Sequence, residues 1–166
     1  MKLYTAGHST HELRDFVDML NAYDVEVVAD VRSKPRSRLP HFDQVPLQEA
    51  LEDAGISYRQ LGDRLGGMPR DPRVADRWRQ GHLDASIVAH LRSTEEWQDG
   101  ISELTGVISR RGGTNVCIIC SEADANECHR KAVALDAAAA LPGLEIVHIA
   151  VHGKAPREVG VQEVML

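Results

Sequence analysis

The sequence VCIIC at residues 116–120 and the sequence VEVVADV at residues 25–31 are two short, almost wholly apolar stretches. Both have the length of a strand and are rich in the β-branched residues Val and Ile. A strand covered by helices on both faces has this continuous apolar character, whereas a strand with one face in water alternates apolar and polar residues. The two stretches therefore predict two central strands of a sheet that lies between two layers of helices.

The rest of the chain alternates between strand-like and helix-like patterns. Three further strands are expected at residues 2–6, 56–61 and 144–151. Apolar spacing or alanine-rich composition predicts helices at about residues 13–20, 46–55, 93–108 and 126–140. Alternating β and α units form a parallel sheet with right-handed crossovers. The sequence thus predicts a single α/β domain over residues 1–166, with a mostly parallel five-stranded sheet and helices on both faces.

Two segments fit this pattern less well. Residues 62–92 are rich in Gly, Pro, Arg and Asp. An irregular connection of that length is unusual and favours a lid or a binding loop. The last residues, VGVQEVML at 159–166, are interpreted either as an added strand or as a contact between subunits, so a homo-oligomer formed through the C-terminal tail is one expectation.

The chain is acidic as a whole but basic in one place. Its formal net charge is −6 and its pI is about 5.7, which argues against a general nucleic-acid binder, because such domains usually have a far higher pI. Four basic residues nevertheless lie within residues 32–38, with no acid among them. An acidic protein with such a patch suits a small anionic ligand, such as a nucleotide.

The sequence gives no sign of a membrane partner or of secretion. It contains no run of 18 apolar residues, and its first ten residues, MKLYTAGHST, lack the apolar region of a signal peptide. Its three cysteines give no disulfide framework. We therefore expect a cytoplasmic protein.

Ligands of parallel sheets bind beyond the carboxyl ends of the strands, and this rule collects a set of polar and reactive residues. The strand order cannot be read from the sequence, so which members of the set are neighbours stays open. The set consists of His8 and Ser9 after the first strand, Asp30, Arg32, Arg36, Ser37 and Arg38 after the second, Gly66 and Gly67 after the third, and Cys120, Glu122, Cys128, His129 and Arg130 after the fourth.

Several of these residues also have a purely structural interpretation. Ser9 with Glu12 matches the capping box that begins a helix. Asp30 is suited to capping a turn or to pairing with Arg32, as well as to a binding site. The basic residues after the second strand form either an anion site or a solvated loop.

The three cysteines have different expected roles. Residues three apart on a strand point to opposite faces, so Cys117 belongs to the core and cannot pair with Cys120. Cys120 is the thiol that we expect to be most reactive. Cys128 shares an apolar stripe with the following helix, yet its place in the first helical turn would lower the thiol pKa. Its assignment to the core or to the site therefore stays open.

A metal site formed by Cys120, Cys128 and His129 is disfavoured by the same helical interpretation. Two neighbouring residues of a helix diverge by about 100° and rarely bind one ion together. The sequence analysis therefore predicts neither a metal nor another cofactor.

The residues discussed above carry a resemblance to a known family. The segments TAGHST (5–10), DVRSKPRSRLPHF (30–42), LGG (65–67) and CSEADANECHR (120–130) resemble, in order and spacing, the signature blocks of the domain of unknown function 488. The similarity covers most of the chain. That family is similar to small α/β bacterial proteins without an established activity, so the resemblance implies a fold and a set of motif residues but no reaction.

The leading functional hypothesis is an enzyme, a hydrolase or a transferase, that acts on a small phosphorylated or nucleotide-like substrate. Glu122 or His8 would serve as general acid or base, and Cys120 or Cys128 as nucleophile. The expected clamp for the anion consists of Arg32, Arg36, Arg38 and Arg130. Two alternatives stay open, namely a non-catalytic module that binds a nucleotide or nucleic acid, and a thiol redox sensor.

Overall fold

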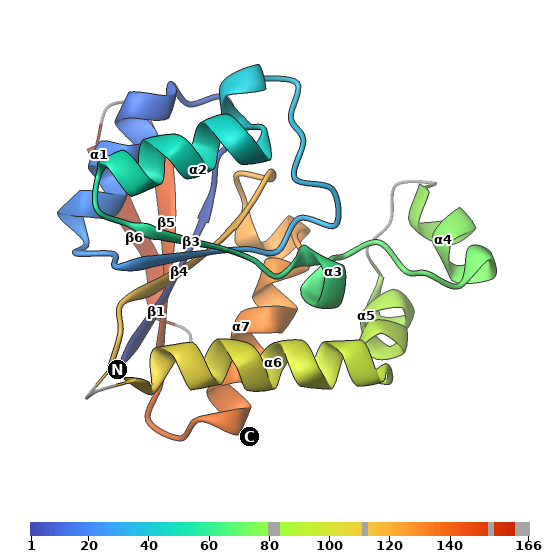
Figure 1. Ribbon diagram of the computed structural model, residues 1–166. Helices are drawn as coiled ribbons and strands as arrows, with labels where there is room; N and C mark the ends of the chain where they lie inside the picture. Colours follow the sequence, from blue (N-terminus) through green and yellow to red (C-terminus); the bar gives the residue numbers. More distant parts are fainter. Residues whose placement is uncertain (80–83, 111–112, 153–154, 162–166) are drawn as a thin grey trace.

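A parallel sheet forms the centre of the structure, a computed structural model that describes residues 1–79, 84–110, 113–152 and 155–161 (Figure 1). The order of the strands is β3-β2-β4-β1-β5-β6. The first five are parallel to one another, and β6 runs antiparallel to β5. Their bounds are β1 (Lys2–Gly7), β2 (Val27–Asp30), β3 (Ser57–Gln60), β4 (Val116–Cys120), β5 (Glu145–His152) and β6 (Ala155–Val161).

The two apolar stretches occupy the predicted interior positions. The strand β4 lies between β2 and β1, and β2 lies between β3 and β4. All five residues of β4 are buried. The α/β class and the mostly parallel sheet expected from the sequence are therefore confirmed.

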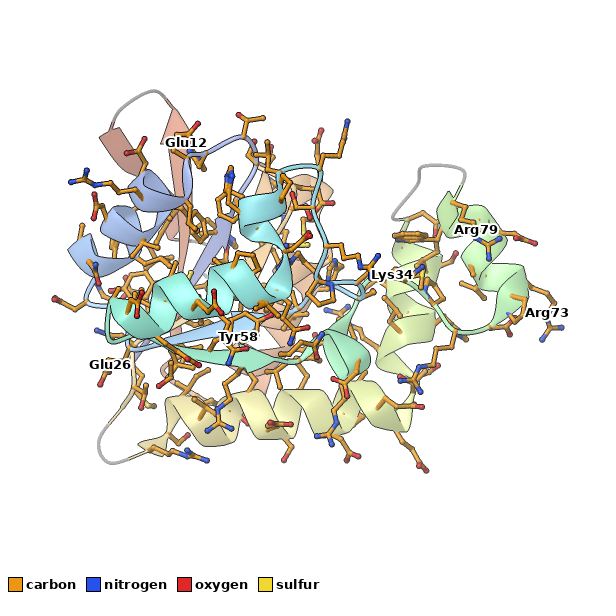
Figure 2. The ribbon with its side chains drawn as sticks, turned by 45° about the horizontal axis from the view of Figure 1, so that its top comes forward. Glu12, Glu26, Lys34, Tyr58, Arg73 and Arg79 are labelled. Carbon is orange, nitrogen blue, oxygen red and sulfur yellow. The ribbon has the colours of Figure 1, made fainter. Side chains whose placement is uncertain are left out.

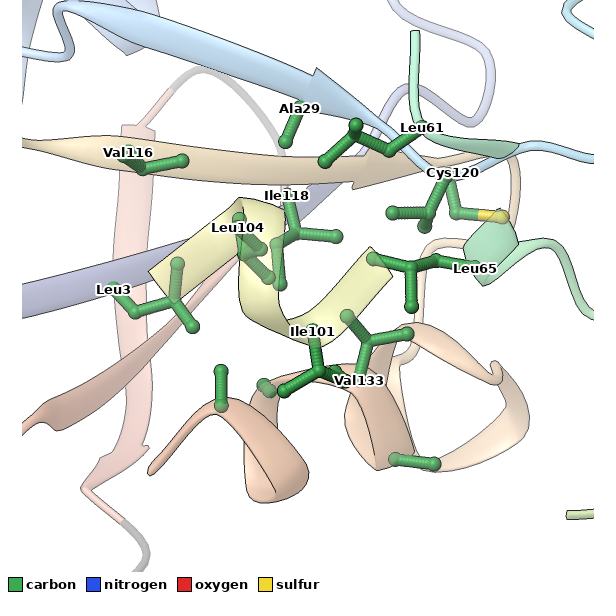
Figure 3. Packing of buried hydrophobic residues seen from close by; sticks show 14 of the residues in the cluster. Leu3, Ala29, Leu61, Leu65, Ile101, Leu104, Val116, Ile118, Cys120 and Val133 are labelled. Carbon is green, nitrogen blue, oxygen red and sulfur yellow. The ribbon is translucent and has the colours of Figure 1, made fainter. Parts of the chain in front are cut away.

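Two pairs of helices cover the two faces of the sheet (Figure 1). Helices α1 (Leu13–Ala22) and α2 (Gln44–Asp53) pack on one face, and α6 (Glu95–Ile108) and α7 (Arg130–Ala140) pack on the other. The alternation of β4 divides its side chains between two apolar clusters. Cys117 joins the cluster on the α1 and α2 side, whereas Cys120 packs with Leu65 and Ile118 on the α6 and α7 side (Figure 3). The predicted separation of these two thiols is thus confirmed.

Residues 62–92 are more regular than the sequence suggested. Apart from residues 80–83, which lie outside the described ranges, the segment folds into α3 (Gly62–Leu65), α4 (Pro72–Arg79) and α5 (Ala85–Arg92). The expectation of an irregular loop was wrong. The apolar stripe of α4 is short, since Ala75 is its buried residue and Val74 and Trp78 are partly buried against the core, and the rest of this eight-residue helix is mostly charged.

Asp136 of α7 holds the C-terminal end of residues 62–92 in place. Asp136 accepts hydrogen bonds from Arg92 of α5, at 2.6 and 2.8 Å, and from the indole nitrogen of Trp97 on α6, at 2.8 Å. A planar guanidinium and a carboxylate that share two hydrogen bonds have a defined relative orientation. Asp136 therefore holds α5 and α6 against α7.

Helix α7 begins four residues later than predicted. A short 3-10 helix, η3 (Ala125–Glu127), precedes it, and Asp124 caps η3 by accepting the backbone N–H of Asn126. Cys128 then has extended backbone angles of φ −133° and ψ 139°. The prediction of one helix over residues 126–140 was therefore wrong at its start, and Cys128 does not lie in a first helical turn.

The N-terminus of α1 also differs from the prediction. Its N-cap is Glu12, which makes no side-chain cap hydrogen bond. Ser9 lies further upstream with a φ of 45°, in the left-handed region. The capping-box interpretation of Ser9 was thus wrong, and the turn places Ser9 next to the loop after β4.

The end of the chain supports the interpretation of an added strand. Residues 159–161 belong to β6, whereas residues 162–166 lie outside the described ranges. Among the residues that the structure describes, no helix combines the length and the apolar character needed to cross a membrane.

Candidate functional site

The strand order brings the carboxyl ends of β1, β2 and β4 together. Three backbone hydrogen bonds continue the sheet beyond its last paired residues. The N–H of His8 donates to Cys120 at 3.0 Å, that of Ser9 to Ser121 at 3.0 Å, and that of Val31 to Ile119 at 3.2 Å. The loops after three strands that are far apart in sequence therefore form one continuous edge.

This edge requires a glycine at the end of β1. A Cβ atom added to Gly7 would lie 1.8 Å from the carbonyl oxygen of Glu122. That distance is far inside van der Waals contact, and the atom in the way belongs to the backbone. The two loops can lie this close only because Gly7 has no side chain. Glu122 therefore lies beside the end of β1.

Asp30 and Arg32 form a buried ion pair rather than an open binding surface. The guanidinium nitrogens Nε and Nη2 of Arg32 contact the Asp30 carboxylate, the shorter distance being 2.5 Å, and the two side chains are 3% and 0% exposed. Tyr58 donates a hydrogen bond to the same carboxylate at 2.7 Å, and Nη1 of Arg32 donates to the carbonyl of Phe42 at 2.7 Å. The ion-pair interpretation of Asp30 is therefore confirmed.

His8 is held between this ion pair and an aromatic ring. Its imidazole stacks on Phe42, with ring centroids 4.4 Å apart, and its Nε2 lies 3.4 Å from Nη1 of Arg32. Burial, together with the positive charge of Arg32, lowers the pKa of His8 to about 4. The imidazole is consequently neutral at pH 7 and able to accept a proton or a hydrogen bond. The sequence analysis did not single out Phe42.

Two pockets open along the edge, and both have Ser121 and Glu122 in their walls. The first, here called the thiol pocket, has a volume of about 230 Å³. The second, here called the basic pocket, has a volume of about 690 Å³. Besides the shared wall, the thiol pocket is lined by residues that include Cys120, Cys128, His129, Gly67, Lys34 and Trp78, and the basic pocket by His8, Ser9, Thr10, Arg36, Ser37 and Arg38.

The basic pocket carries two free cationic side chains. Arg36 and Arg38 are exposed, and in the part of the chain that the structure describes neither guanidinium has an ion-pair or hydrogen-bond partner. The backbone between them is fixed, because the N–H of Ser37 donates to Asp43 at 2.7 Å. Lys34 extends the positive charge of this loop toward the helices α4 and α5 (Figure 2), and it lines the thiol pocket together with Trp78 of α4.

The thiol pocket ends at a buried cluster of three side chains. Cys120, Cys128 and His129 are 4%, 3% and 8% exposed, and one sulfur or nitrogen atom of each lies within 4.8 Å of the other two. The neighbouring Cys120 lowers the pKa of Cys128, and Cys128 in turn raises that of Cys120. His129 and Arg130 lower the pKa of Cys128 further. These neighbours favour the thiolate at Cys128 over that at Cys120.

The imidazole of His129 has a defined orientation. Its Nε2 lies 2.9 Å from the carbonyl oxygen of Val31, and because a carbonyl only accepts, Nε2 carries the hydrogen. Its Nδ1 faces the Cys128 sulfur at 3.9 Å. A Cβ atom added to Gly67 would lie 2.6 Å from this Nδ1, so the glycine allows the backbone to pass over the ring. His129 was predicted as an anion ligand, and the structure places it with the thiols.

Arg130 is buried rather than open to an anion. It is 1% exposed, and its two terminal nitrogens donate to the carbonyls of Glu122 at 2.6 Å and Ala123 at 2.8 Å. It lines neither of the two pockets. Its backbone N–H points at the Cys128 sulfur at 3.5 Å, so Arg130 shapes the loop that carries Glu122 and stabilises the cluster.

The structure therefore brings together some of the predicted site residues but not the four-arginine clamp. Arg36 and Arg38 share the basic pocket with His8, Ser9 and Ser37, whereas the guanidinium groups of Arg32 and Arg130 are used by acceptors inside the protein. A Cβ atom on Gly66 would lie 2.3 Å from atoms of Gly62 and Ser33, which gives Gly66 a packing role. Ser121 was not among the predicted site residues, although it belongs to the 120–130 segment after the fourth strand, and Trp78 was missed because no periodicity or motif distinguishes it.

Comparison with known proteins agrees with the resemblance seen in the sequence. The model of the domain of unknown function DUF488 matches residues 12–135, which include the loops after β2, β3 and β4, whereas His8 and Ser9 precede the matched segment. No curated protein and no solved structure matches the chain. With a family model matching most of its length, this protein belongs to the family of the domain of unknown function DUF488.

Proposed function

We propose that this protein is an enzyme, a hydrolase or a transferase, that acts on a small phosphorylated or nucleotide-like substrate. The observation that carries the proposal is the shared wall formed by Ser121 and Glu122. One side of this wall faces free cationic groups that suit an anion, and the other side faces a buried cluster of reactive groups. A substrate lying over the wall would have its charged part and its reacting part in separate, adjoining pockets.

The basic pocket suits a phosphate group by its charge and its donors. Arg36 and Arg38 have unused guanidinium donors, and such forks bind phosphate oxygens in a bidentate manner. Ser9 and His8 line the same pocket. The imidazole of His8 is uncharged at pH 7, because its pKa is about 4, so the positive charge of the pocket comes from the two arginines.

Glu122 is the group best placed for proton transfer. It is exposed and lines both pockets, and its negative charge acts on His8 and on Cys120. A carboxylate at such a boundary is within reach of a bound substrate and also of solvent, as a general acid or base needs to be. The cluster of Cys120, Cys128 and His129 lies on the other side and supplies the reactive centre.

Removal of either free arginine is expected to weaken anion binding. The variants Arg36→Ala and Arg38→Ala should each bind inorganic phosphate and adenosine monophosphate about tenfold more weakly than the wild type, because a charge-assisted contact contributes roughly 1.5–3 kcal/mol. Isothermal titration calorimetry at fixed ionic strength measures the change.

The matched control is Arg73→Ala. Arg73 is also an exposed arginine, 90% accessible at its side chain, but it lies on the outer part of α4, away from the basic pocket (Figure 2). Its loss should leave both affinities unchanged. Equal affinities in all three variants and the wild type, or no binding of either anion by the wild type, would remove the basis of the proposal.

A further inference from the structure

The cluster in the thiol pocket has the composition of a metal site. Two cysteine sulfurs and one imidazole nitrogen lie within 4.8 Å of one another. All three side chains are buried and line the same pocket. A metal at these residues was disfavoured because neighbouring residues of a helix point in different directions. Cys128 and His129 do not lie in a helix, however, since α7 begins at Arg130.

We propose that Cys120, Cys128 and His129 bind one zinc ion or a similar divalent transition metal, and that the fourth coordination position opens into the thiol pocket. Two thiolates and an imidazole form a donor set that zinc prefers in proteins. The binding of the metal goes beyond the proposed function and does not depend on the identity of the substrate.

The spacing of the donor atoms is close to that of a zinc complex. With the usual zinc–sulfur and zinc–nitrogen bond lengths and a tetrahedral angle, a sulfur and a nitrogen ligand lie about 3.6 Å apart. The distance from the Cys128 sulfur to Nδ1 of His129 is 3.9 Å. This pair of donor atoms is therefore close to the separation that a shared metal requires, and all three donors lie within 4.8 Å of one another.

The surroundings of His129 are those of a metal-binding histidine. Its Nε2–H donates to the carbonyl of Val31 at 2.9 Å, so Nδ1, which faces the Cys128 sulfur at 3.9 Å, is the ring nitrogen that remains to bind a metal, and any proton that it carries leaves when the metal binds. Metal-bound histidines usually donate their other ring hydrogen to a carbonyl or a carboxylate, which fixes the tautomer and the ring plane. The backbone at Gly67 packs against the same ring, so the imidazole is held before any metal arrives.

The charges around the cluster are compatible with a divalent ion. Cys128 accepts the backbone N–H of Arg130 at 3.5 Å, a contact that a thiolate ligand retains while it binds a metal. Both sulfurs bind as thiolates, and the protons that they carry leave to solvent. Two thiolates balance the charge of the ion, so the complex is neutral beside the buried guanidinium of Arg130.

The open coordination position would bring a molecule bound to the metal next to the shared wall. Zinc sites with three protein ligands keep a fourth position for water or substrate, whereas structural sites use four protein ligands. Glu122 and Ser121 line the pocket into which this position opens. If the proposed function holds, the metal would polarise a substrate oxygen, and Glu122 would handle the proton.

The test is a titration of reduced wild-type protein with Co²⁺, followed by competition with Zn²⁺. A thiolate-bound tetrahedral cobalt ion gives intense visible bands and a sulfur-to-cobalt charge-transfer band. We expect one equivalent of cobalt to be bound with these signatures and to be displaced by zinc. Purified protein should also retain close to one equivalent of metal when its elements are quantified.

Three ligand variants and one matched control complete the test. Cys120→Ser, Cys128→Ser and His129→Gln should each weaken metal binding by more than about 100-fold, because even the loss of a partner outside the ligand sphere costs 10–100-fold. Cys117→Ser makes the same change three residues from Cys120, on the opposite face of β4, and should bind like the wild type. Circular dichroism verifies that each variant is folded.

Alkylation of the folded wild type gives a readout that needs no variant. In the presence of a chelator, iodoacetamide should label Cys128 first and leave Cys117 unmodified, and one equivalent of zinc should protect Cys128. The proposal would be overturned if folded, reduced wild type gave no cobalt charge-transfer band, if zinc did not protect Cys128, or if Cys117→Ser lost metal as Cys120→Ser does. Phosphate binding at Arg36 and Arg38 is measured separately and does not depend on these results.

Discussion

Replacement of Asp30 by alanine is expected to lower the free energy of unfolding by about 3–5 kcal/mol, because it leaves the guanidinium of Arg32 buried and unpaired. Arg32 is 3% exposed, and of the four hydrogen bonds that its guanidinium donates to oxygen atoms, three go to the Asp30 carboxylate and one to the carbonyl of Phe42. Tyr58 would lose its acceptor as well. The loss is a large part of the total stability of a typical domain.

Urea denaturation of the wild type and the Asp30→Ala variant measures this difference. The double variant Asp30→Ala/Arg32→Met should recover much of the lost stability, because it removes the unpaired charge as well as its partner. Arg73→Ala breaks an exposed ion pair with Asp71 and leaves the Asp71 carboxylate in place at the start of α4, so it should have no measurable effect. A double variant that is as unstable as Asp30→Ala would show that the charge of Arg32 is not the cause.

Replacement of Glu122 by glutamine is expected to lower kcat by roughly 10²–10⁴-fold, the usual contribution of a general acid or base. KM should change little, because glutamine keeps the size of the side chain and the anion is held by Arg36 and Arg38. The measurement uses a panel of p-nitrophenyl phosphate, nucleoside monophosphates and nucleoside diphosphates, with and without added zinc.

The control for this prediction is Glu49→Gln. Glu49 is exposed on α2 and lines neither pocket, so the same change of charge is made away from the shared wall, and kcat should stay near that of the wild type. An unchanged kcat in Glu122→Gln would exclude the assigned role. If the wild type turned over no member of the panel while still binding phosphate, the non-catalytic binding module would replace the enzyme.

The sequence alone predicted the parallel strands and the edge of the sheet at which the candidate site lies. The stretches VCIIC and VEVVADV are apolar because their strands are covered on both faces, and this cause can be read directly from composition. The rule that ligands bind beyond the carboxyl ends of parallel strands then selected His8, Glu122, Cys120 and Cys128 without knowledge of any contact.

The strand order, in contrast, depends on long-range pairing and could not be predicted. Because β4 inserts between β2 and β1, Cys120 and Glu122 lie between the loops that carry His8 and Arg32. No local pattern of the sequence contains this information. The burial of Arg32 and Arg130 could not be predicted either. Arginines at this edge suggested anion binding, but both guanidinium groups donate to acceptors inside the protein.

The start of α7 shows how a local signal was misinterpreted. Residues 126–140 have helical spacing almost throughout, but Asp124 caps a separate 3-10 turn, and Cys128 is extended. This difference of a few residues changes the direction of the Cys128 side chain. As a result, Cys120, Cys128 and His129, which the sequence disfavoured as a metal site, have donor atoms within 4.8 Å of one another.

An anion is expected to bind against the wall shared by the two pockets. A crystal structure of the wild type grown with inorganic phosphate is the decisive measurement. We expect a phosphate ion in contact with Arg36 and Arg38, beside Ser9 and Glu122. A phosphate bound elsewhere, with none in the basic pocket, would show that the anion site is not here.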